Sequence, residues 1–253
     1  GHNLYPPPTR RSSDLAHLAP RPIPGPHKLT PEILCRAYAA GVFPMSEARD
    51  DPTIFWVDPE MRGVLPLDGL HISKSLRKVL RRGEFEVTAD QAFERVIEAC
   101  ARPRPGQDGQ LGTWINDEII RAFVEMHHIG LAHSVECWQH GPTGKALVGG
   151  LYGISLKGAF MGESMFSTRT NASKVALVHL VARLRMGGYT LLDTQFITEH
   201  LLSMGGVEIA GQEYLDRLER AFTVDAQFPV APSPAELSSE IESLFAQSLS
   251  HTS

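Results

Sequence analysis

The sequence has few cysteines and no long apolar run, and each absence excludes a class of protein. Only three cysteines, Cys35, Cys100 and Cys137, occur in 253 residues, and none forms a CxxC pair. This excludes a disulfide framework and a zinc-ligand spacing, and it suits a reducing, cytoplasmic compartment. No run of 18 apolar residues occurs, so we expect no membrane-spanning helix and no membrane partner. The head of the chain lacks a basic segment followed by an apolar core, so we expect no secretory signal.

Metal-binding motifs are also missing. No HExxH motif and no His/Cys ligand spacing occurs in the sequence. Structural or capping roles are therefore favoured over metal ligation for the histidines that lie near acids or cysteine, which are His127, His128, His133 and His200. We expect no metal site.

The charge is mildly acidic overall but unevenly distributed. A net charge of −5 argues against a general nucleic-acid binder. The tail from Glu213 onward is acidic, with only Arg217 and Arg220 as basic residues. In contrast, residues 72–82 contain no acid and have five basic side chains: Lys74, Arg77, Lys78, Arg81 and Arg82. Such a stripe is either a solvated helix face or the place where a polyanion binds.

The N-terminal part of the chain reads as a disordered segment followed by a small lobe. Residues 1–27 are rich in proline and poor in periodic apolar residues, so we expect them to be disordered. A helix should begin after Thr30, a typical N-cap, with Pro31 in its first turn, and should end at Gly41. The aromatic, proline-punctuated stretch that follows predicts short strands and turns. We therefore expect a small N-terminal lobe over residues 28–68.

From about His71 the pattern becomes α/β, in the broader α+β sense. Apolar periodicity predicts helices over 72–82, 90–101, 115–130 and 174–188, and strands over 132–138, 145–156, 159–166 and 189–196. A strand, a polar loop, a helix and a strand after a β-meander is the topology of the GNAT acyltransferase core. We therefore expect a GNAT-like catalytic domain over residues 69–224 and a C-terminal tail over 225–253.

The polar loop before the last of these helices bears on the acyl donor. Such loops offer backbone N–H groups to a phosphate, and in CoA-dependent acyltransferases the loop is glycine-rich. Here the loop is STRTNAS, without glycine. This difference disfavours CoA as the donor.

Several colinear segments resemble the leucyl/phenylalanyl-tRNA–protein transferase family. Their order and spacing agree with that family between residues 30 and 218. The segments are AYAAGVFPM (37–45), GTWINDEI (112–119), AHSVECW (132–138), VGGLYGISLKGAFMGESMFSTRTNASK (148–174) and LLDTQFITEHLLSMGG (191–206).

The resemblance implies an aminoacyltransferase that needs no cofactor. Such an enzyme would move Leu, Phe or Met from aminoacyl-tRNA to the N-terminal Arg or Lys of acceptor proteins, marking them for N-degron degradation. The ester that joins the amino acid to tRNA is already activated, so positioning and charge stabilisation can supply much of the catalysis. We expect a monomer.

The resemblance places Asp193, Gln195 and Glu163 at the reaction centre. Asp193 and Gln195 alternate on a predicted strand, so their side chains should share one face. Gln195 can orient the attacking amine, and Asp193 can supply charge behind it. Glu163 would bind the basic N-terminal residue or an α-amino group, because a carboxylate among apolar residues is costly unless paired. The alternative for the strand residues is that they cap a sheet.

The resemblance also implies binding sites for both ends of the donor. Trp56 and Trp114 would stack on the terminal adenosine of the tRNA, although core or interface positions are the alternative, and Trp138 is expected in the core. The donor side chain would enter an apolar pocket formed by Phe160, Met165, Phe166, Leu177, Leu180 and Leu184. Family members have phenylalanines at Leu180 and Leu184, so the preference among Leu, Phe and Met stays open.

Two other functions remain open. An acyl-CoA-dependent N-acyltransferase would share the fold and the acceptor amine. A non-catalytic tRNA- or degron-binding module would need the basic helix and the aromatic residues but neither Asp193 nor Gln195.

Overall fold

A computed structural model of the protein describes residues 28–105 and 111–250. The helices are α1 (Pro31–Ala39), α2 (Lys74–Arg82), α3 (Phe93–Cys100), α4 (Asp117–His128), α5 (Ala172–Met186), α6 (Glu199–Ser203), α7 (Gly211–Phe222) and α8 (Pro234–Ser250). The strands are β1 (Phe43–Met45), β2 (Phe55–Val57), β3 (Met61–Val64), β4 (Glu86–Ala89), β5 (Arg104–Pro105), β6 (Leu111–Gly112), β7 (Ala132–Gly141), β8 (Gly144–Leu156), β9 (Ala159–Ser167), β10 (Leu191–Gln195) and β11 (Val207–Ala210). The predicted disorder of residues 1–27 lies outside the described residues.

The centre of the fold is a seven-stranded mixed sheet. Its strand order is β11-β3-β10-β9-β8-β7-β4. β9 and β10 run parallel because α5 connects them as a crossover, while the other neighbouring strands are antiparallel. The expected α/β class is thereby confirmed.

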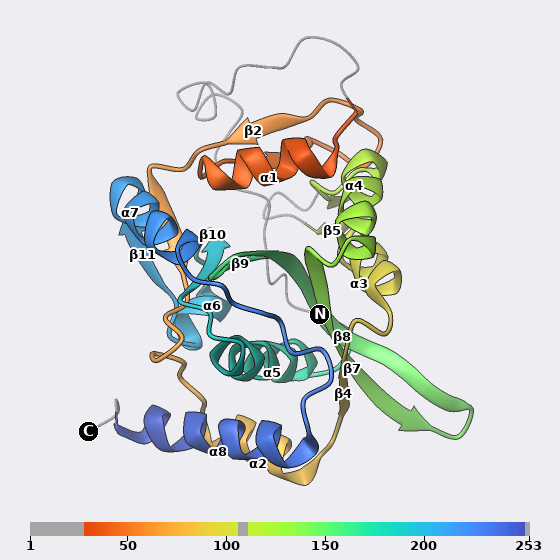
Figure 1. Ribbon diagram of the computed structural model, residues 1–253. Coiled ribbons are helices and arrows are strands. Elements are labelled where there is room, and N and C mark those ends of the chain that lie inside the picture. Colours follow the sequence, from red (N-terminus) through yellow and green to blue (C-terminus); the bar gives the residue numbers. More distant parts are fainter. Residues whose placement is uncertain (1–27, 106–110, 251–253) are drawn as a thin grey trace.

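Helices cover both faces of this sheet (Figure 1). We call one side the α1 face, where α1, α3, α4 and α7 pack in one apolar core. The other side is the α5 face, where α2, α5, α6 and α8 pack in a second core. A side chain on a central strand therefore belongs to one of two separate interiors.

The first helix begins where the sequence predicts. The Thr30 side chain accepts a hydrogen bond from the backbone N–H of Ile33 (3.3 Å), and Pro31 occupies the first turn. The helix ends at Ala39, just before Gly41, whose φ of 83° is costly for any other residue. This turn fixes the position of the end of α1, which reaches into the site described below.

Two parts of the fold differ from the expected domain boundaries. β3 comes from the stretch assigned to the N-terminal lobe, yet it is a strand of the main sheet, between β11 and β10. The expected tail includes α8, whose apolar residues recur at helical spacing. Leu244 and Phe245 of α8 are buried on the α5 face, and the buried Ser248 hydroxyl accepts a hydrogen bond from the N–H of Ile72 (2.8 Å). A large part of the tail is thus a packed helix.

No helix within the described ranges combines the length and apolarity needed to cross a membrane.

Candidate active site

Three residues that the sequence analysis singled out lie together on the α1 face. The Gln195 side chain donates a hydrogen bond from Nε2 to Glu163 Oε1 (3.0 Å). The Gln195 backbone N–H donates to Asp193 Oδ1 (2.8 Å). Exposed fractions of 4% for Gln195, 2% for Glu163 and 0% for Asp193 show that the cluster is buried. Gln195 therefore bridges two buried carboxyl groups.

The backbone at Gln195 is not that of a regular strand. Its φ is 55°, in the left-handed region, and the pairing of β10 with β3 shifts register between Asp193 and Gln195. Simple strand alternation therefore does not bring these two residues to the same cluster. A local bulge does so, and non-glycine residues in this conformation are strained and frequent at functional sites.

Arg62 of β3 neutralises Asp193. Its Nε donates to Asp193 Oδ1 (2.9 Å) and its Nη2 to Oδ2 (2.6 Å), a bidentate ion pair. The hydroxyl of Tyr214, from α7, donates to Oδ2 (3.0 Å). Burial alone would lower the pKa of Arg62, but the charge of Asp193 and its hydrogen bonds outweigh burial and raise that pKa. The ion pair is almost fully buried.

Glu163 is in a different environment. Its Oε1 accepts hydrogen bonds from Gln195 and from the hydroxyl of Tyr38 on α1 (2.7 Å). Burial raises the pKa of Glu163 to about 8, and the charge of Asp193 adds to this, against the hydrogen bonds and the charge of Arg62. Two nearby carboxyl groups with such different surroundings suit different chemical tasks. Glu163 is the one that can exchange a proton near neutral pH.

The two tryptophans expected at the adenosine lie close to the short β1–β2 sheet. Trp56 is on β2, opposite Pro44, and the backbone O of Trp114 accepts a hydrogen bond from the N–H of Ser46 (3.1 Å). Both rings are half-buried and pack against the core of the α1 face. They are thus on the same face as Glu163. Trp138 is buried, as predicted, and its Nε1 donates to Thr88 Oγ1 (2.8 Å).

The residues expected to form the donor pocket do not share one interior. Five are buried in the core of the α5 face: Phe160, Met165, Leu177, Leu180 and Leu184. Phe166 belongs to the core of the α1 face. Alternation along β9 separates it from Met165, and the irregular pairing with β8 between Gly162 and Ser164 places it on the opposite side from Phe160 as well. The expectation that all six surround one space is wrong for Phe166. The other five lie across the sheet from the Glu163 cluster.

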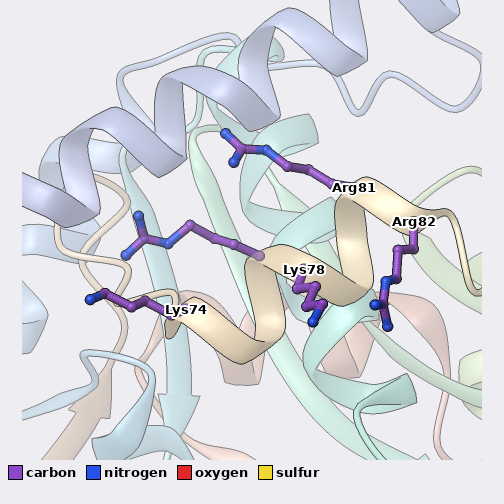
Figure 2. Close-up of a pocket in the computed structure, with 5 residues that line it drawn as sticks. Lys74, Lys78, Arg81 and Arg82 are labelled. Carbon is purple, nitrogen blue, oxygen red and sulfur yellow. The ribbon is translucent and has the colours of Figure 1, made fainter.

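The five basic residues of α2 line a surface hollow of about 310 Å³, which we call the basic hollow (Figure 2). Arg81 forms an ion pair with Glu242 of α8 (2.9 Å), and Arg82 lies 3.7 Å from Glu84. Within residues 28–105 and 111–250, no ion pair is formed by Lys74, Arg77 or Lys78. The hollow therefore presents positive charge to solvent, partly neutralised from α8.

Two of the histidines, His127 and His133, have structural neighbours. The Nδ1 of His127 lies 2.8 Å from the carbonyl oxygen of Ala132, and the Nδ1 of His133 lies 2.7 Å from Asp90 Oδ2. In the part of the chain that the structure describes, no group of three His, Cys, Asp or Glu side chains is arranged to hold a metal ion.

Comparison with known proteins decides the family. The profile of the family described as "Leucyl/phenylalanyl-tRNA protein transferase" matches residues 64–219, and the profile of its N-terminal domain matches residues 27–60. The chain belongs to the leucyl/phenylalanyl-tRNA protein transferase family. The family resemblance drawn from the sequence motifs is confirmed.

Individual members of the transferase family are similar over nearly their whole length. A leucyl/phenylalanyl-tRNA–protein transferase from Rhodospirillum rubrum is 60% identical over 202 residues, covering 80% of this chain and 92% of the relative. Those of Paramagnetospirillum magneticum and Maricaulis maris are 56% and 55% identical, over 79% of this chain and 92% and 90% of the relatives. A solved structure of L-PGS from Bacillus licheniformis aligns over 69% of this chain and 55% of its own chain, at 15% identity. Its TM-score of 0.35 is too low to carry an argument.

The sequence analysis missed three residues of the cluster in this transferase: Tyr38, Arg62 and Tyr214. Tyr38 offered little signal, because its ring packs in the apolar core of the α1 face and only its hydroxyl reaches Glu163. Arg62 offered a signal, because it is a charged residue directly before the apolar run GVLP. Tyr214 offered none, since its hydroxyl meets Asp193 only through the packing of α7.

Proposed function

We propose that this protein transfers Leu, Phe or Met from aminoacyl-tRNA to the N-terminal Arg or Lys of acceptor proteins, and so marks them for N-degron degradation. The observation that carries the proposal is the family membership, with profile matches over residues 27–60 and 64–219. The bridged carboxyl groups of Glu163 and Asp193 support it, because they form a buried polar centre suited to proton transfer.

The reaction is the aminolysis of an ester. The α-amino nitrogen of the acceptor, in its neutral form, attacks the carbonyl carbon that joins the amino acid to the terminal ribose. A C–N bond forms, the C–O bond to the ribose breaks, the nitrogen loses one proton and the ribose oxygen gains one. The protein therefore has to position the two substrates and to supply a proton acceptor.

Glu163 is our candidate for the proton acceptor. Its pKa of about 8 lies close to a physiological pH, so it can take the proton of the attacking nitrogen and return it to the ribose oxygen. Gln195, hydrogen-bonded to Glu163, would orient the amine. Binding of the basic acceptor side chain by Glu163 is an additional role that the resemblance implies.

The remaining sites serve the donor. We propose that Trp56 and Trp114 stack on the terminal adenosine, and that the basic hollow of α2 binds tRNA phosphates. We propose that Phe160, Met165, Leu177, Leu180 and Leu184 border the space for the donor side chain, which would pass between the two faces of the sheet beyond Met161 and Asp193, where the pairing of β9 with β10 ends. The parallel β9–α5–β10 crossover supports a GNAT-like core. A monomer that works in the cytoplasm completes the proposal.

Transfer of radiolabelled Leu from Leu-tRNA to a peptide that begins with Arg or Lys tests the proposal directly. Controls are the same peptide with an acetylated N-terminus, which has no nucleophile, and acetyl-CoA as an alternative donor. Label on the free peptide alone supports the transferase. Acetylation from acetyl-CoA would favour an N-acyltransferase, and tRNA binding without transfer would favour a binding module.

A further inference from the structure

Arg62 is almost fully buried, and its neighbours come from several elements. Its exposed fraction is 1%, and its Cζ lies 4.7 Å from the ring centroid of Phe43 and 4.2 Å from that of Tyr214. Its Nη1 donates to the carbonyl oxygen of Gly41, just after α1 (2.7 Å). A buried guanidinium is costly to desolvate, so it needs all of these partners. Arg62 thus ties the end of α1, strand β3 and Asp193 together.

Asp193 has no room for another hydrogen-bond donor. A carboxylate has about four lone-pair positions. Asp193 accepts from Arg62 Nε, Arg62 Nη2, the Tyr214 hydroxyl and the backbone N–H of Gln195. A proton arriving from a substrate amine would have to displace one of them. Glu163, in contrast, has protein donors only at Oε1 among the described residues.

The bond from Gln195 N to Asp193 Oδ1 holds the left-handed backbone of Gln195. The facing strand is adapted to this conformation. A Cβ at Gly63, which pairs with Gln195, would lie 2.7 Å from the backbone carbon of Phe196 and 2.8 Å from its oxygen. A strained backbone persists only where its surroundings determine it strongly. Asp193 can do so only while Arg62 fixes its carboxylate.

We propose that Arg62 is a positioning residue for aminoacyl transfer: it fixes Asp193 as a fully hydrogen-bonded anchor, which in turn holds Gln195 against Glu163. Asp193 then does not accept the proton of the attacking amine. This inference rests on the proposed function, and it assigns a role to a residue outside the expected set of Asp193, Gln195 and Glu163.

The pKa of Glu163 provides a readout that should stay unchanged if Arg62 has only a structural role. The charged or titratable groups that face it are Tyr38 from α1, Asp193 from β10 and Arg62 from β3. Tyr152 of β8 and Tyr214 of α7 lie behind these. Arg62 lowers the pKa of Glu163 and Asp193 raises it. Removing the charge of Arg62 should therefore raise the pKa of Glu163, and removing the charge of Asp193 should lower it.

The experiment compares Arg62→Gln, Asp193→Asn and Arg62→Lys in the full-length chain, with kcat and KM for each substrate measured from pH 6 to 9.5. Arg62→Gln should lower kcat by about 100-fold, the usual cost of a small misplacement, and leave KM for Leu-tRNA unchanged. The rise of the rate with pH should move to higher pH in Arg62→Gln and to lower pH in Asp193→Asn. Arg62→Lys keeps the charge but not the bidentate geometry. Its pH profile should therefore be close to that of the wild type, while its kcat stays lowered.

Tyr214→Phe is the second variant, in case Arg62→Gln does not fold. It removes one donor to Asp193 and leaves the ring beside Arg62, so it should lower kcat by a smaller factor than Arg62→Gln. Folded variants with wild-type kcat, or pH profiles that shift the same way, would overturn the inference. If the wild type transfers no Leu, the proposed function fails and the inference fails with it. If the wild type transfers Leu and the variants match it, only the inference fails.

Discussion

The Glu163–Gln195–Asp193 cluster and the basic hollow of α2 differ in whether the protein itself neutralises their charges. In the cluster, each charged or polar group is met by a partner from another element, and the chain itself neutralises Asp193 through Arg62. In the hollow, Lys74, Arg77 and Lys78 form no ion pair within the described ranges, and Lys74 and Lys78 are exposed to solvent. A buried charge must be paired by the protein, whereas an exposed charge is stabilised by water and stays available to bind a ligand.

The difference predicts how each region responds to mutation. Buried, interlocked groups act as a unit, so a single change should have a large effect that does not add to others. Exposed basic groups should each contribute a modest, salt-dependent share of the binding energy. Mutations in the cluster and in the hollow therefore test the two halves of this comparison separately.

The largest effect is expected at Glu163. Glu163→Gln keeps the size of the side chain but removes the proton acceptor, so kcat should fall by about 10²- to 10⁴-fold in Leu transfer to an Arg-peptide. Binding of Leu-tRNA should barely change. Glu208→Gln, at an exposed glutamate of β11, is the matched control and should transfer at the wild-type rate. A folded Glu163→Gln variant with wild-type kcat would mean that the substrate supplies its own base.

The same residue should make stability depend on pH. The pKa of Glu163 is about 8 in the folded protein and near 4.5 in the unfolded chain, so the folded state holds a proton that the unfolded state releases. Its contribution to stability is therefore fully present below pH 4.5 and is lost as pH rises towards 8 and beyond. Urea denaturation between pH 5 and 9 should show this decline in the wild type and less of it in Glu163→Gln. Parallel curves for the two proteins would contradict the raised pKa.

The order of the core elements was predictable from the sequence, but the contacts that complete the site were not. Periodic apolar residues predicted the helix now seen at Ala172–Met186 and the strands on either side of it. Leu237, Ile241 and Leu244 also recur at helical spacing, but the acidic residues between them make the tail resemble a solvated segment, so α8 was not predicted. The Arg62–Asp193 pair spans 131 residues of sequence. Such a pairing depends on strand order and on a register shift, which no local pattern encodes.

A smaller effect is expected in the basic hollow. Lys74→Ala/Lys78→Ala removes two exposed charges, so the log–log dependence of tRNA affinity on salt should become shallower, by about 0.7–0.9 for each phosphate that the variant no longer neutralises. Affinity for all cognate tRNAs should fall alike, because phosphates carry no sequence information. Lys28→Ala/Lys157→Ala removes two exposed lysines elsewhere and is the control. An unchanged slope in the first variant would show that the hollow is only a solvated surface.

The smallest effect is expected where α8 meets the hollow. Glu242 pairs with Arg81, whose Cζ also lies 5.1 Å from the ring centroid of Phe245, so α8 holds one basic side chain of the hollow. Glu242→Gln should free Arg81 for a phosphate and raise tRNA affinity by about two- to fivefold, since exposed pairs are weak. Glu219→Gln, at an exposed site on α7, makes the same change in net charge and should leave affinity unaltered. The gain should disappear in Arg81→Ala/Glu242→Gln. If Glu219→Gln raises affinity as much as Glu242→Gln does, the overall charge of the protein, and not the release of Arg81, governs binding at the hollow.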